Sequence, residues 1–388
     1  MYKMLNGDVL EKAKEFEDNT FDALFCDPPY GISFMNKKWD YGLPSTLVWE
    51  EMYRVLKPGA FILVFGGPRT FHRLTCYIED AGFEIRDCLM YVYGKGFPKS
   101  YNIGKKVSEW EGYGTALKPA YEPIILARKP VEGNNVKNCL KYGCGGLNID
   151  ECRIGYSEKD DPRIGKEYSH NAKSGLENGV HKDNSLGQKQ QLHKPQGRWP
   201  TNLILDGSEE VEEMFPNSKS TGGQKSLGAF RNGDIYGKGR DERESGDPGY
   251  GDNGSSSRFF QKCSYTEQDR IFYSSKVSKK ERNAGLENET NSHPTLKPIS
   301  LCEYLAKLIL PPERESSRKI IVPFAGTGSE MAGSLKAGWD EVIGIEYEEE
   351  YCEIAEKRIP GLLNNGEKKE KEEAEKKQEK IYVDDLFE

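Results

Sequence analysis

The chain has 388 residues, a formal net charge of −8, and 30% charged residues. This length can bury a sizeable core without disulfide bonds, as one large domain or two smaller ones. No apolar run approaches a membrane span and the N-terminus carries no signal-peptide pattern, so we expect a cytoplasmic protein that makes no membrane contact. The acidic balance excludes a protein that coats nucleic acid generally, but it allows a local basic groove. Nine cysteines without a Cys-x-x-Cys pair predict no metal site.

Residues 1–130 alternate between expected strands and helices. Strands are expected over 4–5, 22–26, 60–65, 84–93 and 122–128, and helices over 9–16, 46–56 and 69–81. The run 60–65 is almost continuously apolar, which is typical of a strand buried on both faces. Lys57-Pro58-Gly59 is expected to end the second helix. This alternation predicts a parallel sheet covered on both sides.

Residues 131–292 have a different composition, rich in Gly, Asn, Ser and Lys. Within them, 169–196 and 218–257 are expected to be poorly ordered. Three short islands interrupt the region, at 147–149, 199–205 and 258–263. Positive charge is locally enriched over 159–198. Two interpretations stay open for the region: a solvated insertion, or a module that orders on nucleic acid.

Residues 293–360 return to alternating strands and helices. Strands are expected over 319–324 and 341–345, and helices over 301–309, 330–337 and 350–359. Residues 361–388 form a charged tail whose Glu/Lys pattern predicts a solvated helix or disorder. The final acidic and apolar segment, 383–387, is interpreted as packing on its own core or, less readily, as docking on a partner such as a sliding clamp.

The motif Asp27-Pro28-Pro29-Tyr30 follows the apolar run 21–26. Two consecutive prolines cannot continue a sheet ladder, so the chain leaves the strand in a stiff turn. This turn presents a carboxylate, a carbonyl without a neighbouring amide, and a phenol ring at the carboxyl edge of the sheet. Open α/β sheets bind ligands at that edge. Taken alone, the motif is equally compatible with a proline-rich strand exit.

A glycine-rich turn, Phe324-Ala325-Gly326-Thr327-Gly328, joins a strand to a helix, and Glu346 ends the next strand. Glycines in such a turn let a ligand approach the backbone, and an acid at this spacing can accept hydrogen bonds from both ribose hydroxyls. The turn lacks the Lys-Ser/Thr pair of a P-loop and the third glycine of a dinucleotide site. The pattern therefore predicts a nucleoside cofactor without phosphates, a description that S-adenosylmethionine fits.

Together these motifs resemble those of the DNA amino-methyltransferases in their β arrangement. In that arrangement D-P-P-Y precedes a target-recognition region, then H-P-T-x-K-P, then F-x-G-x-G. This chain has 27–30, the polar middle, 293–298 and 324–328 in the same order. Flanking pieces are similar to adenine-specific modification methylases of phages and prophages. The resemblance implies an α/β fold: a Rossmann-like seven-stranded S-adenosylmethionine-dependent methyltransferase sheet, circularly permuted, with an inserted irregular target-recognition region.

The resemblance also implies a domain organisation and a function. Residues 1–130 and 293–360 would be the two parts of the methyltransferase domain, 131–292 a partly disordered target-recognition insertion, and 361–388 a tail. The expected reaction transfers a methyl group from S-adenosylmethionine to the N6 amino group of an adenine flipped out of double-stranded DNA. Asp at the first motif position favours adenine, because cytosine-N4 members more often begin with Ser.

Several alternatives stay open. The same chemistry could act on cytosine N4, on RNA or on a protein glutamine amide, and the fold could serve a non-catalytic DNA-binding regulator. A monomer and a homodimer are both compatible with the sequence, as is a restriction enzyme partner.

The resemblance assigns roles to individual residues. The expected catalytic residues are Asp27, Pro28, Pro29 and Tyr30: the Asp27 carboxylate and the Pro28 carbonyl accept the two amine hydrogens, and Tyr30 stacks on the base. The expected cofactor-binding residues are Asp8, Thr295, Lys297, Phe324, Gly326, Thr327, Gly328 and Glu346. Asp8 is equally interpretable as a helix N-cap. For Lys297, a surface lysine between two prolines is the less favoured alternative. One departure is Val322, where the family usually has an Asp that contacts the methionine part of the cofactor. Asp27 or Ser329 would have to replace that contact.

Overall fold

The structure is a computed structural model that describes residues 1–32, 40–94, 96, 100–155, 197–219, 253–263, 277–286, 289–293 and 295–364. The chain divides into two compact units. Unit 1 comprises Met1–Cys152, Pro200–Glu212 and Phe260–Glu388, and unit 2 comprises Arg153–Trp199 and Glu213–Phe259. None of the helices in the described ranges is long and apolar enough to span a membrane.

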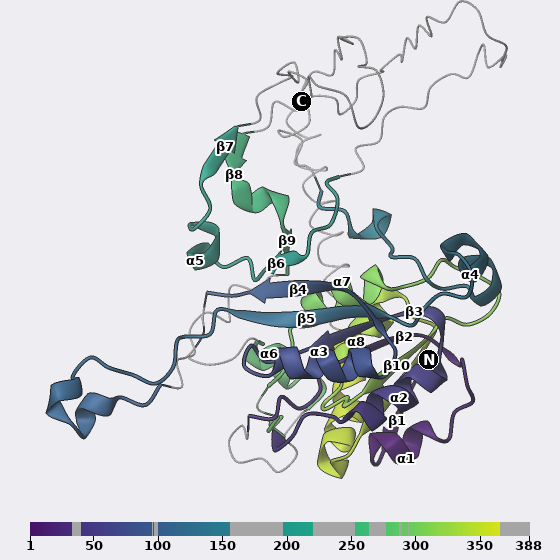
Figure 1. Cartoon of the computed structure of the whole chain (residues 1–388), viewed down its shortest axis with the longest axis horizontal. Coiled ribbons are helices and arrows are strands. Elements are labelled where there is room, and N and C mark those ends of the chain that lie inside the picture. The colour runs from purple at the N-terminus through teal and green to yellow at the C-terminus, as the bar shows by residue number, and fades with distance from the viewer. Residues whose placement is uncertain are drawn as a thin grey trace, which may run out of the picture. The chain divides into compact units, whose positions relative to one another are not determined.

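Unit 1 is built on one sheet, which has nine strands in the described part of the chain (Figure 1). The strands in spatial order are β1 (Tyr2–Asn6), β11 (Glu341–Glu346), β10 (Lys319–Pro323), β2 (Phe21–Cys26), β3 (Leu56–Phe65), β5 (Tyr121–Arg128), β4 (Glu84–Val92), β6 (Leu203–Leu205) and β9 (Gln261–Lys262). Neighbouring strands are parallel, except that β5 is antiparallel to both β3 and β4.

The strand order confirms the predicted permutation. Strands β10 and β11, from the C-terminal part of the chain, lie between β1 and β2. Counted from β10 along the permuted chain, the first seven positions in space read 3-2-1-4-5-7-6. The prediction of a seven-stranded sheet was incomplete, because β6 and β9 from the middle region extend the sheet beside β4.

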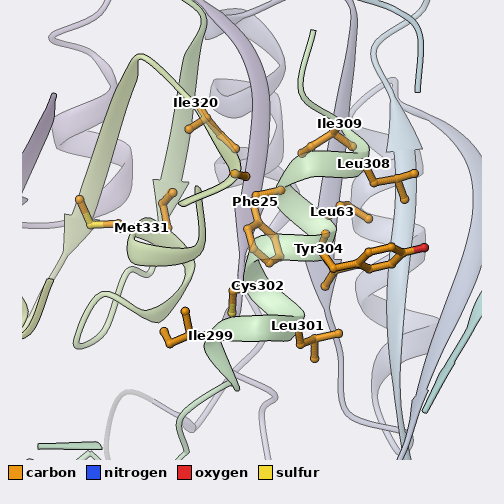
Figure 2. Packing of buried hydrophobic residues seen from close by; sticks show 14 of the residues in the cluster. Phe25, Leu63, Ile299, Leu301, Cys302, Tyr304, Leu308, Ile309, Ile320 and Met331 are labelled. Carbon is orange, nitrogen blue, oxygen red and sulfur yellow. The ribbon is translucent and has the colours of Figure 1, made fainter. Parts of the chain in front are cut away.

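Helices cover both faces of this sheet. The longer ones are α1 (Val9–Ala13), α2 (Thr46–Val55), α3 (Phe71–Asp80), α4 (Asn135–Tyr142), α7 (Ile299–Leu308) and α8 (Ser329–Ala337), and residues 349–364 are also helical. Side chains alternate along β2, so that Phe25 packs with α7 and α8 while Leu24 packs with α2 and α3. Figure 2 shows Phe25 and Leu63 lying against α7. Both faces are therefore buried, as the apolar strand runs predicted.

Two local predictions for unit 1 were wrong. The first helix ends at Ala13 rather than continuing to Phe16. The second helix ends at Val55, just before Lys57-Pro58-Gly59 as predicted, but the strand expected over 60–65 already begins at Leu56, which pairs with Phe21. The pairing of β2 with β3 shifts register just after that point. Pro58 is tolerated there because an irregular stretch of the ladder does not need its missing donor.

Unit 2 contains a small two-stranded sheet made by β7 (Asn217–Lys219) and β8 (Asn253–Ser255). These strands lie at the two ends of the segment 218–257, so the prediction of poor order was wrong for those ends. The remaining predictions of poor order, for 169–196 and for the middle of 218–257, lie outside the described residues, as does the tail with its segment 383–387.

Candidate active site

Three segments that are far apart in sequence end at the same edge of the sheet. Strand β2 leads into Asp27–Tyr30, β10 leads into the turn 324–328, and β11 ends at Glu346. The strand order reverses at β10, since β11 lies on one side of it and β2 on the other. The carboxyl ends of strands at such a switch point border a crevice where α/β proteins bind ligands. The fold thus places the predicted catalytic motif beside the predicted cofactor motif.

Two residues that sequence reasoning missed hold the backbone of the catalytic motif. The amides of Tyr30 and Gly31 donate to the Oδ1 atom of Asp40, at 2.7 and 2.9 Å, and Asp40 is only 2% exposed. The Thr70 hydroxyl donates to the carbonyl of Tyr30 at 2.8 Å. These bonds fix the turn that follows the two prolines. A lone Asp and a lone Thr form no sequence pattern, so nothing in the sequence marked them.

The Asp27 carboxylate is bonded through both of its oxygens. The Tyr30 hydroxyl donates to Oδ1 at 2.8 Å, and the Lys297 ammonium forms an ion pair with Oδ2. Lys297 also donates to the Tyr30 hydroxyl at 3.2 Å and lies 4.5 Å from the centre of the Phe65 ring. Because Lys297 is only 2% exposed, its interpretation as a surface lysine was wrong. The structure places its ammonium on the Asp27 carboxylate.

The ion pair belongs to a larger group of buried charges. This charge cluster consists of the buried residues Glu122, Glu330, Lys297 and Arg358 together with Asp27, whose side chain is 14% exposed. Burial lowers the pKa of Lys297, but the facing carboxylates outweigh burial and raise it above its ordinary value. Burial and the Asp27 charge raise the pKa of Glu330 to about 7, against the opposing effect of the two cations. Burial raises the pKa of Tyr30, with a further contribution from Asp27.

Glu346 is tied directly to the glycine turn. Its carboxylate accepts from the amide of Gly326 at 2.8 Å and from the amide of Glu348 at 2.9 Å. Burial raises its pKa, although both backbone bonds act in the opposite direction. Phe324 and Gly326 have φ values of 58° and 50°, so the chain turns sharply at the end of β10. The turn and the acid form one connected unit.

The residues of this unit fit a nucleoside cofactor. The Glu346 carboxylate accepts from the backbone amides of Gly326, Tyr347 and Glu348, and a carboxylate offers about two acceptor sites per oxygen. Acceptor capacity therefore remains for a ribose hydroxyl. A Cβ at Gly326 would lie 3.2 Å from Nε2 of His293, so the close approach of these two segments requires glycine. The turn carries no lysine that would hold a phosphate.

Other predicted cofactor residues lie in different settings. Asp8 is exposed and caps α1, where its Oδ1 accepts from the Leu10 amide at 2.9 Å. Thr295 is exposed, and its amide donates to Nδ1 of His293 at 3.3 Å. The Thr327 hydroxyl accepts from Asn291 at 2.9 Å. Gly328, with φ 81°, begins α8.

At the position where the family usually has an Asp, this chain has Val322, which belongs to the hydrophobic core. Val322 is fully buried and packs in the hydrophobic cluster beneath α7 and α8. Of the two predicted replacements, Asp27 is held by Lys297, and the Ser329 hydroxyl accepts from Nη1 of Arg358 at 3.0 Å. Both are already engaged with cations.

Unit 2 gathers arginines and aromatic rings, and three of these residues, Trp199, Arg258 and Phe259, belong to two of the short sequence islands. The guanidinium of Arg153 lies 5.1 Å from the ring centre of Trp199, and those of Arg198 and Arg258 lie 5.1 and 4.3 Å from the ring centre of Phe259. Trp199 is 63% exposed. We call these five residues the arginine-aromatic cluster. Such combinations suit both phosphates and unstacked bases.

The sheet order, the proline motif and the acid-bound glycine turn define an S-adenosylmethionine-dependent methyltransferase of the α/β class. The chain matches the family model described as DNA methylase, which covers N6 and N4 methyltransferases, over residues 21–357. It belongs to this N6/N4 DNA methylase family.

Individual relatives match parts of the chain. The type II methyltransferase M.HindIII of Haemophilus influenzae is 29% identical over 198 residues, which cover 37% of this chain and 63% of the relative. M.BamHI of Bacillus amyloliquefaciens is 24% identical over 159 residues, covering 30% and 37% of the two chains. The matches thus span less than two thirds of these relatives.

Solved structures were compared as well. The complex of M1.HpyAVI with SAM has a TM-score of 0.40 at 14% identity, and covers 92% of this chain and all of that one. The cytosine-N4-specific PvuII DNA methyltransferase has a TM-score of 0.42 at 12% identity, and covers 94% of this chain and 91% of that one. Scores this low carry no argument about the target base.

Proposed function

We propose that this protein is a site-specific DNA methyltransferase that methylates the N6 amino group of a flipped-out adenine. The observation that carries the proposal is the position of Asp27–Tyr30 beside the Glu346-bound glycine turn at one switch point. Family membership supports amino-group methylation of DNA. The Asp at the first motif position favours adenine over cytosine. The proposed place of action is the cytoplasm.

The cofactor side of the site is proposed to be the glycine turn. Phe324, Gly326, Thr327 and Gly328 would line the methionine and ribose, and Glu346 would hold the ribose hydroxyls. S-adenosylmethionine supplies a methyl group that its sulfonium already activates. The protein therefore needs no nucleophile of its own. Its task is to hold the target nitrogen in line with the methyl carbon at near-attack distance.

The substrate side is proposed to be the proline turn. The amine of adenine is a weak nucleophile because its lone pair is delocalised into the ring. Asp27 and the Pro28 carbonyl would accept its two hydrogens and so localise the lone pair. Asp27 can do this while it stays bonded to Tyr30 and Lys297, because its two oxygens offer about four acceptor sites. Lys297 would act as a positioning residue that holds the Asp27 carboxylate in place.

The remaining step is loss of a proton from the methylated nitrogen. The nitrogen would take the methyl group as the sulfur–carbon bond breaks and the sulfur leaves as a neutral thioether, so the nitrogen would become positively charged and release one hydrogen as a proton. The Asp27 carboxylate is proposed to accept that hydrogen bond and to pass the proton to solvent. Stacking of the flipped base on the Tyr30 ring would contribute about 1–3 kcal/mol.

DNA beyond the target base is proposed to contact unit 2. The arginine-aromatic cluster offers positive charge for phosphates and rings for exposed bases. This supports a target-recognition role for residues 131–292. Residues 1–130 and 293–360 are proposed to act together as the methyltransferase domain.

The test is methyl transfer from labelled S-adenosylmethionine to DNA, with nucleoside analysis of the product. The wild-type chain should give N6-methyladenine. Asp27→Asn should lower the rate of transfer by at least about a hundredfold while cofactor affinity stays within about twofold. Labelled N4-methylcytosine would show that the target base is cytosine, and transfer to RNA alone would show that the substrate is RNA. Full activity of Asp27→Asn would refute the proposed role of Asp27.

A further inference from the structure

Between β4 and β5 the chain forms an arm, residues 100–118, in which no residue is buried. Figure 1 shows the arm projecting past the arrowhead of β4. Five large apolar or aromatic side chains of the arm are exposed: Tyr101, Val107, Trp110, Tyr113 and Leu117. The described part of the chain has fifteen exposed side chains of this kind, so this short segment holds a third of them. Large apolar side chains that gather in one exposed place mark an interaction surface.

The arm combines exposed rings with positive charge. Trp110 and Tyr113 form an edge-to-face pair with ring centres 5.1 Å apart, and they are 49% and 59% exposed. The segment 95–118 contains five lysines and two glutamates, in a chain that is acidic overall. Lys105 and Lys106 are both exposed, and neither forms an ion pair with a described residue. Exposed aromatic rings with surplus lysines suit a nucleic acid.

The arm has a defined shape although it has no core of its own. The Thr115 amide donates to the Ser100 hydroxyl at 2.9 Å, and the Ile103 amide donates to the Tyr113 carbonyl at 3.1 Å. These bonds join the two sides of the arm. The Tyr113 amide also donates to the Trp110 carbonyl at 3.1 Å. The two exposed rings are therefore held by backbone hydrogen bonds and not by burial.

The neck of the arm is closed where it meets the sheet. The Tyr93 amide donates to the Ala120 carbonyl at 3.0 Å, which continues the pairing of β4 with β5. A Cβ at Gly96 would lie 1.7 Å from the Pro119 oxygen, so the two sides of the neck touch. Both strands therefore determine where the arm leaves the sheet.

The arm starts at the sheet edge that carries the proline motif. Strand β2 is parallel to β3, and β3 and β4 are both antiparallel to β5. Strands β2 and β4 therefore run in the same direction, and their carboxyl ends lie at one edge. Asp27 follows the end of β2, and the arm follows the end of β4. Because β3 and β5 lie between them, the two ends are about 14 Å apart along the sheet. About four base pairs of duplex span that distance.

We propose that the arm binds duplex DNA beside the target base, with its lysines on phosphates and its rings on the sugar or base surface. This inference rests on the proposed methylation of DNA and adds a contact surface to it. A target base that is bound at Asp27 brings the flanking duplex to this edge of the sheet. The charge of the arm is complementary to DNA, and its distance from Asp27 suits base pairs outside the target.

The first test replaces both rings, as Trp110→Ala with Tyr113→Ala. Affinity for a mixed-sequence DNA duplex should fall by about fivefold to a hundredfold. Affinity for S-adenosylhomocysteine, measured by titration calorimetry, should not change. The matched control is Val136→Ala with Leu140→Ala on α4, which are 69% and 84% exposed. Helix α4 follows the carboxyl end of β5, at the opposite edge of the sheet, so the control should leave both affinities unchanged.

The second test replaces both exposed lysines, as Lys105→Ala with Lys106→Ala. Each phosphate contact adds about 0.9 to the slope of log affinity for DNA against log salt concentration. That slope should therefore become shallower by about 2 in the lysine variant, and it should not change in the ring variant. Lys137→Ala with Lys141→Ala, which removes two exposed lysines from α4, is the matched control and should keep the wild-type slope.

Three results would overturn the inference. One is wild-type DNA affinity in the ring variant, and another is a wild-type salt slope in the lysine variant. The third is a dimer in light scattering that the ring variant converts to a monomer, because the rings would then bind a second copy of the chain. If the ring variant also loses affinity for S-adenosylhomocysteine, the salt slope of the lysine variant decides. If the wild-type chain neither binds nor methylates DNA, the proposed function fails instead.

Discussion

Lys297 forms an ion pair with Asp27 of the other motif, although its own motif predicted a place near the cofactor. The side chains of Lys297 and Asp27 are only 3% and 14% exposed, so each neutralises the other in a largely buried setting. Lys297→Met should leave Asp27 as an unpaired buried charge and lower the free energy of unfolding by about 3–5 kcal/mol. Urea denaturation at neutral pH measures the change.

A double variant at Asp27 and Lys297 tests whether the two charges stabilise each other. Asp27→Asn combined with Lys297→Met removes both charges, so most of the lost stability should return, while methyl transfer should stay absent. If the double variant instead loses as much free energy of unfolding as the two single variants together, the two residues do not couple energetically.

His293 gives the protein a pH-dependent stability. Burial lowers the pKa of His293 to about 3, with further lowering by Lys297 and Arg358. The unfolded chain binds a proton at this residue below about pH 6.5, whereas the folded chain stays neutral until about pH 3. Stability should therefore fall as the pH drops through this window, by up to about 1.4 kcal/mol per unit. In His293→Gln the melting temperature should change less between pH 7 and pH 5 than in the wild type.

At the scale of elements, helices α7 and α8 touch through their backbones. A Cβ at Gly333 of α8 would lie 2.4 Å from Cβ of Cys302 and 2.6 Å from its carbonyl carbon, both on α7. Gly333→Ala must push the two helices apart and should cost about 1–3 kcal/mol of stability. Gly146→Ala is the control, since a Cβ there meets nothing within 4 Å, and its effect should stay within about 0.5 kcal/mol. Equal effects in chemical denaturation would contradict the close packing.

Most elements could be predicted from sequence because their patterns are local. The helix Thr46–Val55 and the strand Tyr121–Arg128 agree with their expected ranges to within a residue. The failures come from tertiary context. Strand β3 begins at Leu56 because β2 offers it a partner, and β6 forms because β4 has a free edge. Neither partner is visible in the local sequence.

The whole molecule depends on the interleaving of its two ends. Strands β1 and β2 do not pair with each other, because β10 and β11 lie between them. A fragment of residues 1–219 should therefore remain unfolded by circular dichroism, and co-expression with residues 253–388 should restore a folded complex. Cooperative unfolding of the first fragment alone would contradict this dependence.

The candidate site could be predicted only in part. The motif order located Asp27–Tyr30, the glycine turn and Glu346, because each combines unusual residues at fixed spacing. The bonds of Asp40 to the proline turn and the pairing of Lys297 with Asp27 depend on contacts between distant segments, which the motifs do not encode. Long-range charge pairing therefore required the structure.

The pairing of Asp27 with Lys297 joins residues that are 270 positions apart. A ribosome that adds about 5–20 residues per second needs roughly 15–50 s to travel from one to the other. During that interval the nascent chain has neither the cation that neutralises Asp27 nor the strand that flanks β2. If the middle region selects the DNA sequence, as proposed, it has emerged before the site can close. Methyl transfer and sequence selection would then become possible at the same time. An incomplete chain would therefore not methylate DNA without sequence selection.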